Sequence, residues 1–206
     1  MSTKTNIKKN SSVFLVTAFL SFFFPIPAWS EGVGPFGFDV GKDQFEDIKG
    51  RLDGYGCDYS KTTAITSGKI AVCPSGKFDL KELTNDVLFV FSYDGVLEAV
   101  SMNVSIYSLS EVKPIYLNLC SKYRLIKTNI PQGDLSLPSH AYLNAEFQSA
   151  PYSNENVNLL LDYDYTRMSG EGKMHLMYST DRFREKHKSY TERLQQEKDA
   201  KQKGQL

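Results

Sequence analysis

The sequence predicts an α+β fold, in which an antiparallel sheet carries helices on one face and a further helix follows at the C-terminus. Three observations predict this class: short β-rich runs are bounded by turn residues, two segments carry apolar residues at helical spacing, and the elements run strand–helix–strands, helix–strands, helix. This order also allows a duplicated unit of one helix and three or four strands. The repeats would then be residues 36–107 and 108–180 of one domain over 31–180, followed by a charged helix and a frayed tail over 181–206.

The first thirty residues have the features of a signal peptide. Basic residues precede the apolar run 13–24, which at about twelve residues is too short for a bilayer span of about 20 residues. Ala28 and Ser30 supply small residues at the −3 and −1 positions of a cleavage site. We therefore expect cleavage after Ser30 and a periplasmic or secreted chain with no stable membrane anchor. An uncleaved anchor is the alternative.

Charge is nearly balanced in the mature chain, but it is unevenly distributed. Residues 31–180 hold 13 basic and 19 acidic side chains, whereas residues 181–206 hold 8 basic and 5 acidic ones. A nucleic-acid-binding protein needs a strongly basic face. We therefore expect no nucleic-acid partner.

The first elements after the leader are expected to be a short strand and a helix. Alternation of Phe36, Phe38 and Val40 with small or polar residues predicts the strand. Asp43 is expected to cap the helix, with Glu46 as its reciprocal partner in a capping box. The apolar face of this helix has i, i+3, i+7 spacing and consists of Phe45, Ile48 and Leu52.

Two hairpins are expected next. The segment AITSGKIAVC predicts two short β arms around Ser67-Gly68, and DVLFVFSYDGVLEAVSMNVSIYS predicts two longer ones around Asp94-Gly95. We expect a type I′ turn at Asp94-Gly95, because this dipeptide tolerates positive φ at both central positions.

A second helix is expected from about Ser110, and four strands follow it. The helix has one core-facing stripe: Val112, Ile115, Tyr116, Leu119 and Tyr123. The strands lie in YRLIKTNI, AYLNAEFQ, NVNLLLDYDY and KMHLMYS. Thr180 or Ser179 is expected to cap the last helix, which should fray after Leu194 because almost no apolar residue follows.

Three cysteines remain in the mature chain. Cys57 and Cys73 bracket a polar loop, and in an oxidising compartment we expect them to form a disulfide. Cys120 is expected to be a buried small hydrophobe, because a catalytic thiol would need a nearby histidine. The absence of a C-x-x-C pair and the scattered histidines predict no metal site.

A glycine fingerprint occurs at Gly32–Gly37, where GVGPFG matches G-x-G-x-x-G. A dinucleotide site needs a buried strand before the first glycine and a helix that opens at the third. Here the predicted signal peptide precedes the motif, and a predicted strand follows it. We therefore interpret these glycines as a leader into the first element and expect no cofactor.

The stretch FGFDVGKDQFEDIKGRL, with the LFVFSYDGVLEAV hairpin after it, resembles the opening of small exported bacterial proteins in which a G-[ML]-[ST]-x-x-[EQ]-[VI] helix start leads into strands. It is similar to outer-membrane assembly lipoproteins of the SmpA/OmlA type and to the β-lactamase-inhibitor-protein fold, which duplicates the same unit. Gly41, Asp43, Glu46 and Ile48 occupy the matching places. The lipoprotein cysteine is missing, so the resemblance implies an exported binding protein without a lipid anchor.

Two functions are expected from the residues. The first is a non-enzymatic binding module of inhibitor, immunity or envelope-maintenance type, whose partner is a protein or another envelope macromolecule. Tyrosine is enriched at interfaces and also in ordinary sheets, and the candidate binding surface comprises Tyr142, Tyr163, Tyr165 and Tyr178. The alternative is a periplasmic hydrolase or carbohydrate-acting enzyme that uses Asp162, Asp164 and His175, which must then converge in one pocket.

Overall fold

The computed structural model describes residues 33–106, 109–129, 143–149, 157–166 and 171–203. Its elements, in chain order, are η1 (Pro35–Gly37), α1 (Phe45–Gly54), β1 (Asp58–Thr62), β2 (Lys69–Cys73), η2 (Ser75–Lys77), β3 (Val87–Phe91), β4 (Leu97–Ile106), α2 (Leu109–Lys122), β5 (Arg124–Thr128), β6 (Leu143–Gln148), β7 (Val157–Thr166), β8 (Glu171–Thr180) and α3 (Asp181–Lys203). Within these ranges, no helix is both long enough and apolar enough to cross a membrane. The predicted signal peptide lies outside the described residues.

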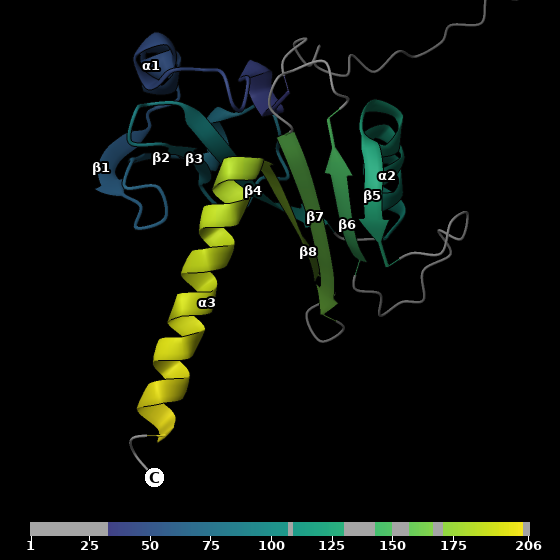
Figure 1. Cartoon of the computed structure of the whole chain (residues 1–206). Coiled ribbons are helices and arrows are strands. Elements are labelled where there is room, and N and C mark those ends of the chain that lie inside the picture. The colour runs from purple at the N-terminus through teal and green to yellow at the C-terminus, as the bar shows by residue number, and fades with distance from the viewer. Residues whose placement is uncertain (1–32, 107–108, 130–142, 150–156, 167–170, 204–206) are drawn as a thin grey trace, which may run out of the picture.

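The eight strands of the described ranges form one antiparallel sheet, in the order β1-β2-β3-β4-β8-β7-β6-β5 (Figure 1). Each half is a helix followed by a four-stranded meander, and the last strands of the two halves, β4 and β8, pair at the centre of the sheet from Ala99–Ser179 to Ile106–Gly172. The α+β class is thus confirmed. The ranges 36–107 and 108–180 each enclose one such unit, with four strands in each, and a true duplication stays a prediction.

The main core lies between the sheet and the first two helices. α1 buries Phe45, Ile48 and Leu52, and α2 buries Val112, Tyr116 and Leu119, as their apolar spacing predicted. All six belong to one cluster with inward-facing residues of both meanders. Each fully buried large apolar side chain contributes about 1.5–3 kcal/mol. Both helices therefore pack on the same face of the sheet.

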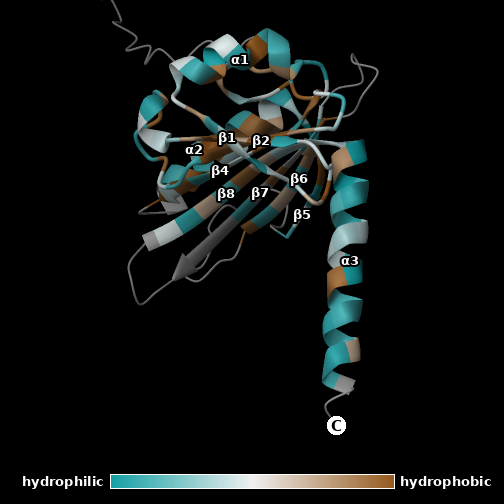
Figure 2. Cartoon of the chain, turned by 90° about the vertical axis from the view of Figure 1, so that its left-hand side faces the viewer, coloured by the Kyte–Doolittle hydropathy of each residue, from teal (hydrophilic) through white to brown (hydrophobic). Residues whose placement is uncertain are grey.

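α3 packs on the opposite face, which Figure 2 shows as the side of the sheet away from α2. Its Phe183 is buried against Val90 and Ala99, in a cluster separate from the main core. The predicted Thr180 cap is confirmed, because its Oγ1 accepts the Phe183 N–H at 3.1 Å. The helix continues past Leu194 to Lys203, and fraying of its end stays a prediction.

The expected first strand is wrong. Phe38 and Val40 are buried as the alternation predicted, but residues 35–37 form a 3₁₀ turn and 38–40 join no sheet. Phe36 has φ of 58° and Gly37 has φ of 75°, a left-handed bend that breaks the extended backbone. The alternation therefore indicates which residues are buried, and it does not indicate a strand.

The expected capping box on α1 is wrong as well. The helix begins at Phe45 after Gln44, and no side chain caps it. The Asp43 carboxylate instead accepts the Asp39 N–H at 2.8 Å, and the Asp43 carbonyl accepts the Leu97 N–H at 2.8 Å. Asp43 therefore fixes the turn before α1 to the start of β4.

Both predicted hairpins exist, with corrections. In the first, β1 ends at Thr62, so the first arm lies earlier than AITS. In the second, the Ser92 N–H bonds the Val96 carbonyl at 2.8 Å, which leaves a three-residue loop. Only Gly95 has positive φ there (88°), so the type I′ prediction is wrong. The geometry matches a three-residue loop that ends in a left-handed glycine.

Candidate functional site

The face of the sheet opposite α1 and α2, named here the open face, is the candidate site. Along β4, β6 and β8, buried residues of the core face alternate with half-buried or exposed residues of the open face. Among the described residues, α3 is the one helix packed on this face, and both views show its distal end projecting away from the body (Figures 1 and 2). The open face therefore leaves side chains of several strands partly accessible to solvent.

Four polar side chains line up across four consecutive strands of the open face. This polar row consists of Ser101 on β4, His175 on β8, Asp162 on β7 and Asn144 on β6. His175 pairs with Asp162, which in turn pairs with Asn144. Ser101 Oγ lies 2.8 Å from His175 Nε2, and Asn144 Nδ2 donates to Asp162 Oδ1. All four residues are half-buried, so the row is both ordered and accessible.

His175 is the titratable centre of the polar row. Burial lowers its pKa below the usual 6.5, and the negative charge of Asp162 partly opposes this shift. The imidazole is therefore neutral at pH 7, with one ring nitrogen protonated and the other able to accept. A neutral imidazole next to a serine hydroxyl can take up its proton.

The first turn of α3, called its foot here, is attached to the open face by charged groups. Glu98 of β4 is completely buried, and its carboxylate pairs with Arg182 and accepts the Thr180 hydroxyl. Farther across the sheet, Arg184 lies 3.2 Å from a Glu146 carboxylate oxygen. The rest of α3 is largely exposed. The helix is therefore fixed by its first turn.

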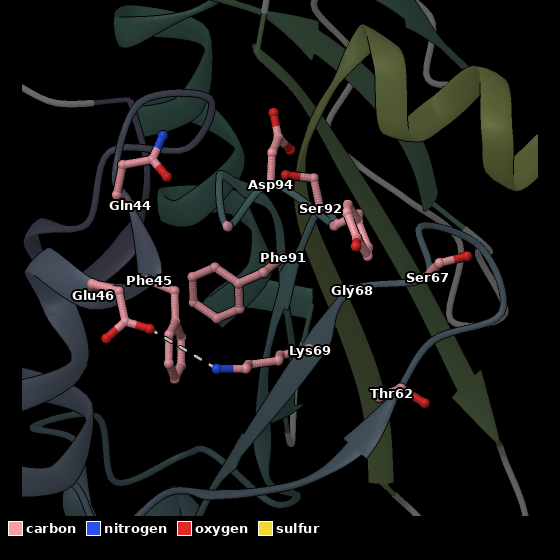
Figure 3. A pocket seen from close by; sticks show the side chains of 12 residues that line it. Gln44, Phe45, Glu46, Thr62, Ser67, Gly68, Lys69, Phe91, Ser92 and Asp94 are labelled. Atoms are coloured by element: carbon pink, nitrogen blue, oxygen red, sulfur yellow. Dashed lines mark ion pairs between the residues drawn. The ribbon is translucent and has the colours of Figure 1, made fainter.

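A pocket of about 380 Å³ lies at the end of the sheet where α1 begins (Figure 3). The Lys69 ammonium lies 4.0 Å from the centre of the Phe45 ring and 3.9 Å from a Glu46 carboxylate oxygen. Gly68 is required here, because a Cβ would fall 2.1 Å from the Phe91 carbonyl oxygen. The cation at the mouth is thus already paired, and the pocket is separate from the polar row.

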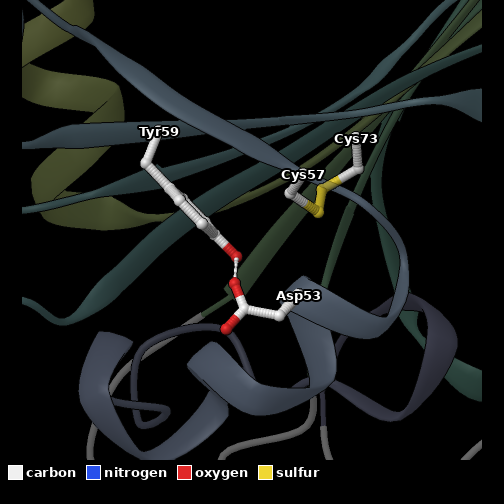
Figure 4. Close-up of a disulfide and its surroundings, with 4 residues drawn as sticks. All are labelled: Asp53, Cys57, Tyr59 and Cys73. Atoms are coloured by element: carbon white, nitrogen blue, oxygen red, sulfur yellow. Dashed lines mark hydrogen bonds between the residues drawn. A yellow bond between two sulfur atoms is a disulfide. The ribbon is translucent and has the colours of Figure 1, made fainter.

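The predicted disulfide between Cys57 and Cys73 is present (Figure 4). It joins the segment after α1 to the end of β2. Beside it, the Tyr59 hydroxyl donates to the Asp53 carboxylate at 2.7 Å, which links β1 to α1. The expectation that Cys120 is buried is wrong, because this cysteine is free and exposed.

Of the four tyrosines predicted to form a binding surface, only Tyr178 has a described side chain. Tyr178 is fully buried in the main core, so its assignment to an exposed surface is wrong. The backbone of Tyr163 pairs in register with Leu143 and Met174. The side chains of Tyr163 and Tyr165 lie outside the described part of the structure. Tyr142 lies outside the described residues.

The residues of the predicted hydrolytic site have separate outcomes. Asp162 and His175 are cross-strand neighbours. Asp164 lies two residues after Asp162 on β7, and only its backbone is described. Ser101 was missed, because its partner lies 74 positions away in the sequence. The outward position of Ser101 on a strand gave the only local signal. Among the described residues, no three His, Cys, Asp or Glu side chains gather to hold a metal ion.

No protein-family model matches the chain, and no curated protein or solved structure matches it. The resemblance to assembly lipoproteins and to the inhibitor fold therefore stays an expectation.

Proposed function

We propose that this chain is an exported module that binds a protein or another envelope macromolecule through its open face. The observation that carries this proposal is the unequal coverage of the sheet. α1 and α2 hold one face, while the described part of the other is covered only near the foot of α3. The half-buried polar groups of this face can form hydrogen bonds with a partner, and the projecting helix gives the surface a shape that a partner can match.

Export is supported by two independent features. The leader has the charge, length and small residues of a signal peptide, and the Cys57–Cys73 disulfide is a bond that persists in oxidising compartments. An inhibitor, immunity or envelope-maintenance role fits such a module, as does the resemblance in the first helix.

Photo-crosslinking in intact cells tests the proposal. A photoreactive phenylalanine analogue is placed at Asn103 on the open face, or at Lys113, which is exposed on α2. We expect a defined crosslinked species from position 103, and none from position 113. Ser105→Arg, which adds a bulky charge next to position 103, should remove the species. Equal crosslinking from both positions, or none from position 103, contradicts the proposal.

A further inference from the structure

We propose that Ser101 and His175 form an acyl-transfer site on the open face, with Asp162 as the positioning residue. The substrate class is a carboxylic ester or thioester, and the acyl group passes from it to Ser101 and then to water. This activity goes beyond the proposed binding function and does not depend on any partner.

The contact between nucleophile and base is already formed. Ser101 Oγ and His175 Nε2 are 2.8 Å apart, within the 2.6–3.2 Å reach of an activated nucleophile. The sheet provides the alignment, because β8 lies between β4 and β7. His175 therefore stands between the serine and the carboxylate.

Asp162 acts through the imidazole. It pairs directly with His175, and cross-strand pairs place their Cβ atoms about 4.5–5.5 Å apart. Ser101 is one strand farther, about another 4.8 Å across the sheet. The carboxylate is itself held by Asn144, whose backbone N–H donates to Asn129 Oδ1 at 2.8 Å. Asp162 can thus orient the imidazole and stabilise the imidazolium that forms during transfer.

An oxyanion donor is available on the same strand. Asn103 lies two residues from Ser101 on the open face and pairs with His175. Its side-chain amide makes no hydrogen bond to any residue that the structure describes. Asparagine amides serve as oxyanion donors in other serine hydrolases. We therefore assign Asn103 to the developing negative charge on the substrate carbonyl oxygen.

The reaction balances without a further reactant. Ser101 Oγ forms a bond to the carbonyl carbon as its proton moves to His175 Nε2. The bond to the leaving oxygen or sulfur then breaks, and the leaving group takes that proton. Water next attacks the acyl-serine and gives a proton to His175. The Ser101–acyl bond breaks, and the serine recovers the proton. One ester or thioester and one water yield one acid and one alcohol or thiol.

Among the side chains that the structure describes, two charged groups lie near His175. Asp162 on β7 and Lys173, two residues along β8, share its face, and β4 presents only the uncharged side chains Ser101, Asn103 and Ser105 to it. The residues of the polar row are half-buried, and Met177, which pairs with Ser101 across β4 and β8, provides an apolar neighbour. These features suit an acyl group on a molecule too large to enter a deep pocket.

Labelling with a fluorophosphonate ester tests the site. The purified protein, with its disulfide intact, is treated with the probe and analysed by intact mass and peptide mapping. We expect one adduct, at Ser101. Ser101→Ala should abolish it, and His175→Gln should slow labelling about 10²-fold or more, as expected for loss of a general base. Ser105→Ala, on the same strand and face, should label like the parent protein.

The pH profile separates a chemical role from a structural one. The labelling rate should rise with the fraction of neutral His175 and follow the pKa that NMR measures for this ring. Asp162→Asn should move both to lower pH together and leave the far-ultraviolet circular dichroism unchanged. No adduct, an adduct at another serine, or a profile that ignores the His175 pKa overturns the proposal, even if partner crosslinking succeeds.

Discussion

The two partners of the buried ion pair at the foot of α3 should respond very differently to removal. Glu98 is 0% exposed, whereas the Arg182 side chain is 42% exposed. Arg182→Ala leaves a buried carboxylate with only the Thr180 hydroxyl as a described partner, and an uncompensated buried charge costs about 3–5 kcal/mol. Glu98→Gln removes the buried charge, keeps a group that can bond Thr180, and lets Arg182 turn into water. Its cost should be about 1 kcal/mol.

Urea denaturation followed by circular dichroism measures this asymmetry. With a slope of about 2 kcal/mol per molar urea, Arg182→Ala should lower the midpoint by about 1.5–2.5 M, and Glu98→Gln by about 0.5 M. Lys186→Ala, an exposed basic residue one turn farther along α3, is the matched control and should stay within about 0.5 kcal/mol of the parent. The reasoning is refuted if Glu98→Gln costs as much as Arg182→Ala.

Three further predictions concern titration, the disulfide and a close backbone approach. The pKa of His175 in the folded protein lies below its unfolded value, so neutral His175 should contribute fully to stability above about pH 6.5, and this contribution should be lost as the pH falls through the folded pKa. In Asp162→Asn, NMR should show a still lower pKa for His175, because the negative charge that opposes the shift is gone. A higher His175 pKa in that variant would contradict the assignment. Replacing Cys57 and Cys73 by serine should destabilise the protein by about 3 kcal/mol, since the bridge closes a 16-residue separation; an unchanged thermal midpoint in non-reducing buffer would show that the bridge does not form. Gly68→Ala should lower the thermal midpoint, since the new methyl meets a β3 carbonyl oxygen at 2.1 Å, and Gly76→Ala, with open space around it, is the control.

Much of the fold follows from local patterns in the sequence. The apolar stripe of α2 and the strand–turn–strand signal around Asp94-Gly95 are complete within short windows, so the helix and hairpin were predicted. The strand predicted over residues 36–40 is absent, because burial at every second residue does not require a strand. The capping box failed because Asp43 bonds Asp39 and Leu97 instead.

The candidate site depends on long-range pairing, which the sequence does not display. Ser101 meets His175 because β4 pairs with β8, and a one-residue shift would send either side chain to the other face. Tyrosine composition could not reveal that Tyr178 belongs to the core row. The pairing of β4 with β8, which joins the two halves, therefore determines which residues share a surface.

Cross-strand nuclear Overhauser contacts between β4 and β8 test this pairing most directly. If β4 and β8 join the halves into one sheet, alternate pairs in the ladder from Ala99–Ser179 to Ile106–Gly172 should show close Hα–Hα contacts, in the register that sets Asn103 opposite His175. A shift by one residue, or a β4 whose outer amides exchange as rapidly as those of an edge strand, would contradict the sheet and the polar row that it aligns.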